Sequence, residues 1–265
     1  MADPVGVSGC LSWHDASDSS TLYDATSGGS LVAADGSVAR WEDKSGNGWH
    51  AINSTSGQRP LRKTSIQNTR DCIQFDGTDD RLRTSSNFSE TGNAEFSVFV
   101  VSKKLTATKG TILGWGISGT SLGASGIYDD NALIQWGYAG ANGFQISTIG
   151  TTSFHLHSYL KSAGAINTTS TMRRDLASVA TSGHQTTTPN IVSGPLGLGM
   201  WADFTSVLYH GYIAEVLIYD SKLSDTNRDS VELYLYNKWF VASSTDFDNS
   251  MSGGMSGSMT GGMAS

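Results

Sequence analysis

The sequence predicts an all-β domain, built as a sandwich of two antiparallel sheets with one short helix near its C-terminal end. Short apolar segments recur at short intervals, and glycine-rich turn sequences separate them. Charged residues make up only 15% of the 265 residues, whereas glycine occurs 31 times. Short strands joined by such turns are typical of β-sandwiches. A chain of this length buries about 70% or more of its unfolded surface, which is enough for a stable core.

Nine segments have the composition of strands. Phe96–Val101, with the sequence FSVFVV, is almost entirely apolar and is therefore expected to be buried on both faces. Cys72–Phe75 alternates and ends at the turn sequence Asp76-Gly77. The other predicted strands are Cys10–Trp13, Thr111–Trp115, Ala132–Trp136, Phe144–Ile149, Phe154–Leu160, Pro195–Leu198 and Ile213–Tyr219.

A single helix is predicted over residues 225–239. Ser224 precedes it as a candidate N-cap, and Asp225 lies in the first turn, where the helix dipole favours a negative charge. Apolar residues recur every four positions along one face. They are Val231, Leu235 and Trp239.

Three sequence blocks, in this order and spacing, carry a family resemblance. They are WEDKSGNGWHA (41–51), IQFDGTDD (73–80) and IAEVLIYDSKLSDTNRDSVELYLYNKW (213–239). The chain resembles, over roughly residues 5–241, the laminin G-like branch of the concanavalin A-like lectin/glucanase superfamily. The resemblance implies a jelly-roll sandwich of two antiparallel sheets. Members bind carbohydrates, act as adhesion modules or occasionally hydrolyse glycans, and many occur in bacteriophage virion proteins.

The first of these blocks also has a physical interpretation. Residues 45–48, Ser-Gly-Asn-Gly, suit a tight turn with positive φ angles. Asp43 is expected to accept backbone N–H groups across this turn, with Trp41 and Trp49 packed beneath it. We therefore interpret the block mainly as a determinant of the fold.

No sequence motif supports catalysis. The paired-carboxylate strand of the glucanase branch, ExDxxE or ExDxE, does not occur, and Glu215 and Asp220 would lie on opposite faces of their strand. The segments 114–119 (GWGISG) and 119–123 (GTSLG) match nucleotide-binding and nucleophile-elbow patterns, but no helical sequence follows either one. We predict no catalytic residues and no enzymatic activity.

Glycans are the ligand class expected to bind, because aromatic rings stack on sugars. The candidate rings, in glycine-rich loops between residues 115 and 140 and beside residue 200, are Trp115, Tyr128, Trp136, Tyr138 and Trp201. Calcium is the one cofactor considered, since lectin-like jelly rolls often hold it in loops and it prefers oxygen ligands. The candidate ligands are Asp79, Asp80, Asp129, Asp130 and Asn131.

The formal charge of −7 and the scattered basic residues argue against nucleic-acid binding. No apolar run is long enough for a membrane span, and the N-terminal sequence MADPVGVSG lacks the features of a signal peptide. Cys10 and Cys72 both lie in apolar segments. We expect them to be two buried thiols or, in an oxidising compartment, to form a disulfide with each other.

The composition changes abruptly after residue 241. We predict a sandwich domain over residues 1–241 and a Ser/Gly/Met-rich tail over residues 242–265. The tail has a glycine-rich backbone that opposes helix formation and methionines at intervals of four, namely Met251, Met255, Met259 and Met263. Methionine adapts to irregular apolar pockets, so we expect these side chains to dock onto a partner protein.

Together, the tail, the N-terminus without a leader and the family's occurrence in phages predict a virion structural protein. It would be a capsid decoration or a fibre-associated subunit, assembled in the host cytoplasm and displaying the sandwich outward. Its expected partners are other virion or capsid proteins, in an oligomeric assembly, and a cell-surface glycan. The alternatives are a free lectin or adhesion module and, less favoured, a glycoside hydrolase.

Overall fold

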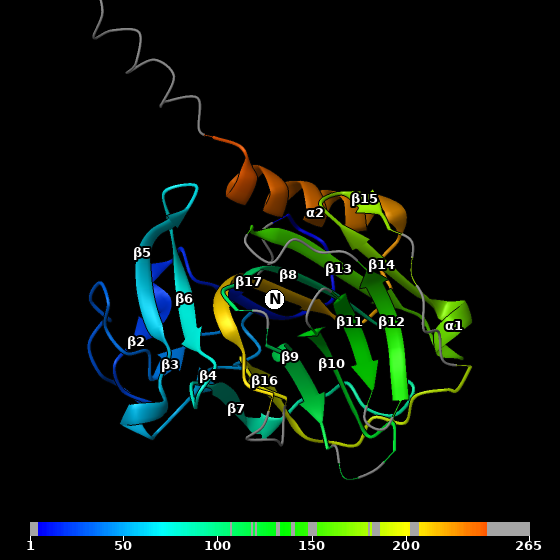
Figure 1. Ribbon diagram of the computed structural model, residues 1–265, viewed down its shortest axis with the longest axis horizontal. Helices are drawn as coiled ribbons and strands as arrows, with labels where there is room; N and C mark the ends of the chain where they lie inside the picture. Colours follow the sequence, from blue (N-terminus) through cyan, green and yellow to red (C-terminus); the bar gives the residue numbers. More distant parts are fainter. Residues whose placement is uncertain are drawn as a thin grey trace, which may run out of the picture.

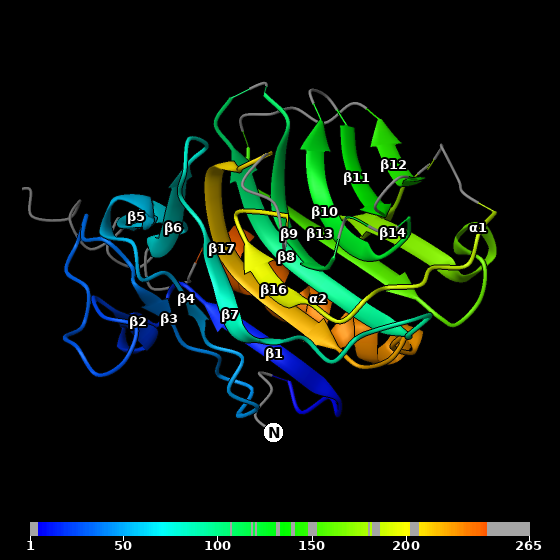
Figure 2. The ribbon, with the colours of Figure 1, turned by 90° about the horizontal axis from the view of Figure 1, so that it is seen from below.

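Two antiparallel sheets form the molecule, as the sequence predicts (Figures 1 and 2). The computed structural model describes residues 5–106, 108–117, 119, 121–130, 133–138, 141–147, 153–179, 181, 186–201 and 207–242. The predicted docking tail, with Met251, Met255, Met259 and Met263, lies outside the described residues, so the division at residue 241 stays a prediction.

The first sheet, sheet A, has the strand order β15-β14-β13-β8-β17-β6-β5, and β1 also pairs with β17. Its strands are β1 (Cys10–Asp15), β5 (Leu61–Gln67), β6 (Arg70–Asp76), β8 (Phe96–Lys104), β13 (His155–Lys161), β14 (Ser170–Arg174), β15 (Ala177–Ser178) and β17 (His210–Tyr219).

The second sheet, sheet B, has the order β12-β11-β10-β9-β16-β7-β4-β3-β2. Its strands are β2 (Leu22–Tyr23), β3 (Arg40–Trp41), β4 (Ala51–Ile52), β7 (Leu82–Asn87), β9 (Gly110–Gly116), β10 (Ala124–Asp130), β11 (Leu133–Tyr138), β12 (Ala141–Ser147) and β16 (Pro195–Leu198). The helical segments are α1 (Ile166–Thr169), α2 (Asp225–Phe240) and two 3-10 turns, η1 (Ser19–Thr21) and η2 (Ser56–Gln58).

Strand β8 explains how the layers stack, because it is buried on both faces as FSVFVV predicts. Phe96 and Val98 join the core between the two sheets, whereas Phe99 and Val101 face a second core beneath α2. Helix α2 therefore covers the outer face of sheet A, and none of the described helices covers the outer face of sheet B (Figure 1).

Helix α2 confirms the predicted helix to within one residue. The Ser224 hydroxyl accepts the N–H of Asn227, and Lys238 lies in the last turn. Val231, Leu235 and Trp239 are buried against sheet A. None of the helices in the described ranges is long and apolar enough to cross a membrane.

The turn after β3 is also confirmed. Gly46 and Gly48 have φ angles of 88° and 79°. The Asp43 carboxylate accepts the backbone N–H groups of Ser45 and Trp49, at 2.9 and 3.0 Å. This block therefore acts as a determinant of the fold. Cys10 and Cys72 are buried thiols and are not joined by a disulfide.

The expectation of loops between residues 115 and 140 was wrong. Most of this segment belongs to β9, β10 and β11, which are adjacent strands of sheet B. The sequence of β10, ASGIYDD, lacks the apolar run of a typical strand.

Candidate functional site

The outer face of sheet B carries a polar row along β7. Leu82 is buried in the core. The residues at positions 83, 85 and 87, which point to the opposite face of the strand, are exposed. Alternation of two residues along a strand places Arg83, Ser85 and Asn87 on one face. Arg81 precedes them at the same spacing.

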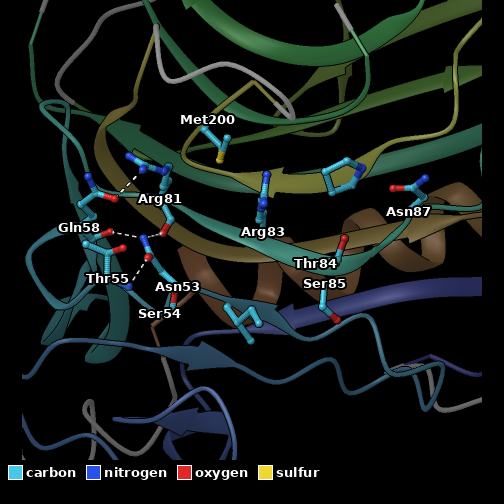
Figure 3. Close-up of a pocket in the computed structure, with 12 residues that line it drawn as sticks. Asn53, Ser54, Thr55, Gln58, Arg81, Arg83, Thr84, Ser85, Asn87 and Met200 are labelled. Atoms are coloured by element: carbon cyan, nitrogen blue, oxygen red, sulfur yellow. Dashed lines mark hydrogen bonds between the residues drawn. The ribbon is translucent and has the colours of Figure 1, made fainter.

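This row forms one side of a pocket of about 650 Å³ (Figure 3). Ligand pockets for small molecules typically have volumes of about 300–1,000 Å³. The pocket lies where β4, β7 and β16 meet, and it is lined by Ile52, Asn53, Ser54, Thr55, Gln58, Arg81, Arg83, Thr84, Ser85, Asn87, Pro195 and Met200. Amide and hydroxyl side chains predominate, and the described lining residues include two arginines and no carboxylate.

Hydrogen bonds fix one wall of the pocket. The Asn53 side-chain amide donates to the backbone carbonyls of Gln58 and Arg81, at 2.6 and 2.9 Å. The Arg81 guanidinium donates to the Gln58 side-chain carbonyl and to the carbonyl of Asp79. This wall is held in place before any ligand binds.

Arg83 differs from Arg81. Its side chain is exposed, and it makes no hydrogen bond or ion pair with any residue that the structure describes. The residue that pairs with it on β16 is Gly197, which has no side chain to compete for the guanidinium. Arg83 is therefore a free cation on the surface of the pocket.

A row of glycines continues from Arg83 across the sheet. Gly197 pairs with Gly114 of β9, Gly114 with Gly126 of β10, and Gly126 with Gly137 of β11. These residues alternate with core residues, so the row lies on the outer face. All four glycines are buried, so neighbouring parts of the chain lie over the row.

Two aromatic rings lie against this row of glycines. A side chain at Gly126 would come within 3.1 Å of the Trp201 ring, and one at Gly137 within 2.3 Å of the Tyr128 ring. The two rings meet edge to face, with centroids 5.9 Å apart. Trp201 follows Met200 of the pocket, and its indole N–H has no hydrogen-bond partner among the described residues.

The five aromatic residues predicted to bind glycans therefore divide between two faces. Tyr128 and Trp201 lie on the outer face of sheet B, each 8% exposed. The other three, Trp115, Trp136 and Tyr138, are in the core between the sheets, at most 3% exposed. Trp136 stacks on Tyr159 at 4.3 Å. These three rings offer no open face to a sugar, because alternation turns them inward.

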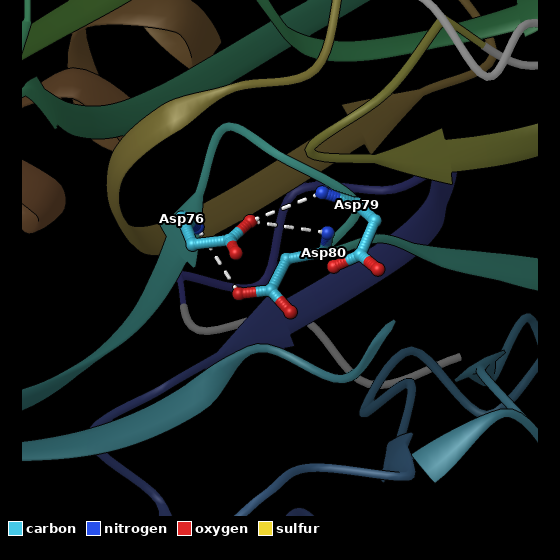
Figure 4. A group of neighbouring side chains, drawn as sticks. All are labelled: Asp76, Asp79 and Asp80. Atoms are coloured by element: carbon cyan, nitrogen blue, oxygen red, sulfur yellow. Dashed lines mark hydrogen bonds between the residues drawn. The ribbon is translucent and has the colours of Figure 1, made fainter. Parts of the chain in front are cut away.

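Three acidic side chains converge in the loop after β6 (Figure 4). One carboxylate oxygen from each of Asp76, Asp79 and Asp80 lies within 4.8 Å of the corresponding oxygens of the other two residues. Asp76 accepts the N–H groups of residues 78, 79 and 80. Burial opposes ionisation of Asp76, but these hydrogen bonds lower its pKa. Burial and the neighbouring Asp76 charge raise the pKa of Asp80 to about 6.

This cluster contains two of the predicted calcium ligands, Asp79 and Asp80, and adds Asp76. The other predicted ligands, Asp129 and Asp130, lie at the end of β10, and Asn131 is outside the described residues. Calcium takes about six to eight oxygens, and three carboxylates are a partial set. Calcium binding at residues 76–80 stays a prediction.

No protein-family model matches the chain, and no curated protein matches it. Solved structures do match. A GH54 α-L-arabinofuranosidase soaked with a cyclic sulfate inhibitor has a TM-score of 0.61 at 16% identity, and the match covers 89% of this chain and 64% of that chain.

The sialidase of Trypanosoma rangeli matches as well. Its complex with 2,3-difluorosialic acid has a TM-score of 0.52 at 13% identity, covering 90% of this chain and 35% of that chain. Its complex with sialic acid has the same TM-score and identity and covers 92% and 35%. This chain thus spans about a third of the sialidase and less than two thirds of the arabinofuranosidase.

At these identities, the comparisons establish the fold. It is a β-sandwich of the kind found in glycoside hydrolases, which is related to the jelly-roll folds of lectins. The expectation of a virion structural protein is contradicted, because these similar structures are glycoside hydrolases and none of them is a virion component. The same finding contradicts the expectation that the protein is not an enzyme.

Sequence reasoning missed the pocket itself. Its main strand, β7, has the sequence LRTSSN, which is too polar to be recognised as a strand. The available signal was the alternation of Leu82 and Thr84 with polar residues, which is typical of a strand with one face in water. The other walls come from residues distant in sequence, so only the fold brings them together.

Proposed function

We propose that this β-sandwich binds carbohydrate in the pocket beside β7, as part of a glycoside-hydrolase-like protein. The pocket carries the proposal. Its amide and hydroxyl side chains both donate and accept hydrogen bonds, which suits sugar hydroxyls. Pro195, Ile52 and Met200 supply apolar surface for the C–H faces of a sugar ring.

Two further observations support the proposal. The wall formed by Asn53, Gln58 and Arg81 is already hydrogen-bonded, so little side-chain entropy is lost when a ligand binds. The three similar structures described above, each with a TM-score above 0.5, are carbohydrate-active enzymes. The finer assignment, to the laminin G-like branch, rests on the sequence blocks at residues 41–51, 73–80 and 213–239.

A bulky substitution tests the pocket directly. Ser85 is exposed on β7 and its hydroxyl makes no hydrogen bond with the described residues, so Ser85→Trp should fill the pocket without disturbing the sheet. Binding to a panel of arabino-, xylo-, gluco-, galacto- and uronic-acid oligosaccharides is measured by calorimetry. We expect at least one ligand to bind wild type and to bind Ser85→Trp more than tenfold more weakly.

The matched control is Thr64→Trp, at an exposed position of β5 in sheet A. It should bind like wild type. The proposal fails if no oligosaccharide binds at millimolar concentration, or if Ser85→Trp binds as tightly as the control.

The comparisons favour glycoside hydrolysis as a second candidate function. This chemistry usually needs two carboxylates on either side of the scissile bond, and none of the described residues that line the pocket carries one. The carboxylates of Asp79 and Asp80 immediately precede Arg81 of the pocket wall. Turnover of an arabinoside or sialoside that Asp80→Asn abolishes would support hydrolysis. Turnover that survives Asp80→Asn would exclude this carboxylate as the acid.

A further inference from the structure

The charge of the pocket differs in sign from that of the whole chain. The formal net charge is −7, yet the described residues that line the pocket include Arg81 and Arg83 and no aspartate or glutamate. Neither guanidinium forms an ion pair with a residue that the structure describes. A cavity with uncompensated positive charge favours an anionic ligand group over a neutral one.

The two arginines have different roles. Arg81 is committed to the wall through the Gln58 side chain and the Asp79 carbonyl. Arg83 has no hydrogen-bond or ion-pair partner among the described residues, and it lies two residues further along the same face of β7. Its planar fork of N–H donors matches a carboxylate with two parallel hydrogen bonds.

The surroundings of Arg83 leave room for such a ligand. Arg83 lines the pocket, and the residue that pairs with it on β16 is Gly197. Ser85 and Asn87 follow Arg83 on the same face of β7. A sugar placed against Ser85 and Asn87 could therefore present an acidic substituent to Arg83. Hydroxyls of the same ring would face the amides of the pocket.

We infer that the sugar bound in this pocket carries a carboxylate, as a uronic acid or another sugar acid does, and that Arg83 is its anion partner. The inference rests on the proposed carbohydrate binding and adds the ligand's charge to it. Arg83 acts as a specificity-determining residue, because it distinguishes an acidic sugar from its neutral counterpart of the same shape.

Matched ligand pairs test this inference. The first pair is tri-galacturonate and its methyl ester. The second is an oligosaccharide of glucuronoxylan and its carboxyl-reduced form. In each pair the ring and its linkages are the same, and the carboxylate is replaced by a neutral methyl ester or hydroxymethyl group. Dissociation constants are measured by calorimetry at 50 and 500 mM NaCl, for wild type, Arg83→Gln and Arg228→Gln.

Arg228→Gln is the matched control. It removes the same charge from α2, on the outer face of sheet A, where Arg228 pairs with Asp225 and Asp229. We expect wild type to bind the acid at least about tenfold more tightly than its neutral form in one of the pairs. Salt should reduce this ratio. In Arg83→Gln the ratio should fall to about one, and in Arg228→Gln it should be unchanged.

The outcomes separate this inference from the proposed function. Equal binding of acid and neutral forms by wild type would overturn the inference while leaving carbohydrate binding intact. Equal losses for both forms in Arg83→Gln would overturn it too, because Arg83 would then act through shape. Failure of every acidic and neutral oligosaccharide to bind would overturn the proposed function and this inference with it. Thermal unfolding of each variant verifies that it is folded.

Discussion

The ammonium group of Lys238 lies 2.7 Å from a carboxylate oxygen of Glu215, which is fully buried beneath α2. The indoles of Trp13 and Trp239 also donate to this carboxylate, at 2.8 and 2.7 Å. Burial and the neighbouring charge of Asp15 raise the pKa of Glu215, while Lys238 opposes the shift. Glu215 thus joins α2 to sheet A, which explains an acid inside an otherwise apolar strand.

Removing the lysine should destabilise the fold strongly. In Lys238→Met, Glu215 loses its cation in a buried position, which typically costs about 3–5 kcal/mol. The control, Lys63→Met, breaks the exposed pair with Asp35 and should cost less than about 1 kcal/mol. Urea unfolding of the two variants measures the difference, and equal losses would contradict this role of Lys238.

A second substitution should rescue part of that loss. Glu215→Gln in the Lys238→Met background replaces an unpaired buried charge by a neutral amide. We expect the double variant to be more stable than Lys238→Met alone. A double variant that is less stable than Lys238→Met would show that the carboxylate does not depend on the lysine.

The stability of the fold should depend on pH through Asp80. Its pKa is raised from 3.8 to about 6, so the folded state holds a proton that the unfolded state releases near pH 4. The stability that this group contributes is full below pH 4 and is lost as the pH rises through about 6, a decrease of about 1–3 kcal/mol.

Asp80→Asn should remove this decrease and raise the free energy of unfolding at pH 7. Asp35→Asn, at an exposed carboxylate, is the control and should leave the pH profile unchanged. Chemical unfolding at a series of pH values from 4 to 8 provides the measurement. A wild-type profile that rises over this range through Asp80 would reverse the predicted sign.

Calcium binding makes a separate prediction for the same loop. Burial and the neighbouring charge of Asp76 raise the pKa of Asp80, and a cation held by Asp76, Asp79 and Asp80 would offset both effects. Calcium should then raise the melting temperature at pH 7 in wild type, and less so in Asp79→Asn, relative to samples with EDTA. Identical melting curves with calcium and with EDTA would end the calcium hypothesis.

The glycine row on sheet B should not tolerate side chains. In Gly126→Ala the new Cβ would lie 2.5 Å from the Leu113 carbonyl oxygen and 2.9 Å from the Cα of Gly114. Such overpacking costs about 1–3 kcal/mol. Gly57→Ala, with no atom within 4 Å of the new Cβ, should change stability little. Equal stability of the two variants would contradict the close packing of this face.

Much of the fold could be predicted from local sequence signals. FSVFVV at residues 96–101 indicated a strand buried on both faces, and the spacing of Val231, Leu235 and Trp239 indicated α2. These signals are local because a strand or helix repeats its own period. By contrast, β7 and β10 have weak apolar patterns, since side chains on one face are polar or absent.

The candidate site could not be predicted, because it depends on strand pairings that are not evident from the sequence alone. Trp136 and Trp201 are both tryptophans near glycines, but alternation turns the first inward and the fold places the second on the outer face. Arg83 gave no signal beyond its charge. Its predicted role as an anion partner depends on its pairing with Gly197 of β16. It also depends on the lack of a carboxylate among the described residues that line the pocket.

The most direct test of carbohydrate binding in the pocket is an NMR titration that follows side-chain amide signals. Asn53, Gln58 and Asn87 line the pocket, whereas Asn47 and Asn68 donate to backbone carbonyls elsewhere. During titration with the tightest-binding oligosaccharide of the panel, the three pocket amides should shift and saturate together while those of Asn47 and Asn68 stay unchanged. Pocket amides that do not shift at saturating ligand would contradict the proposed site.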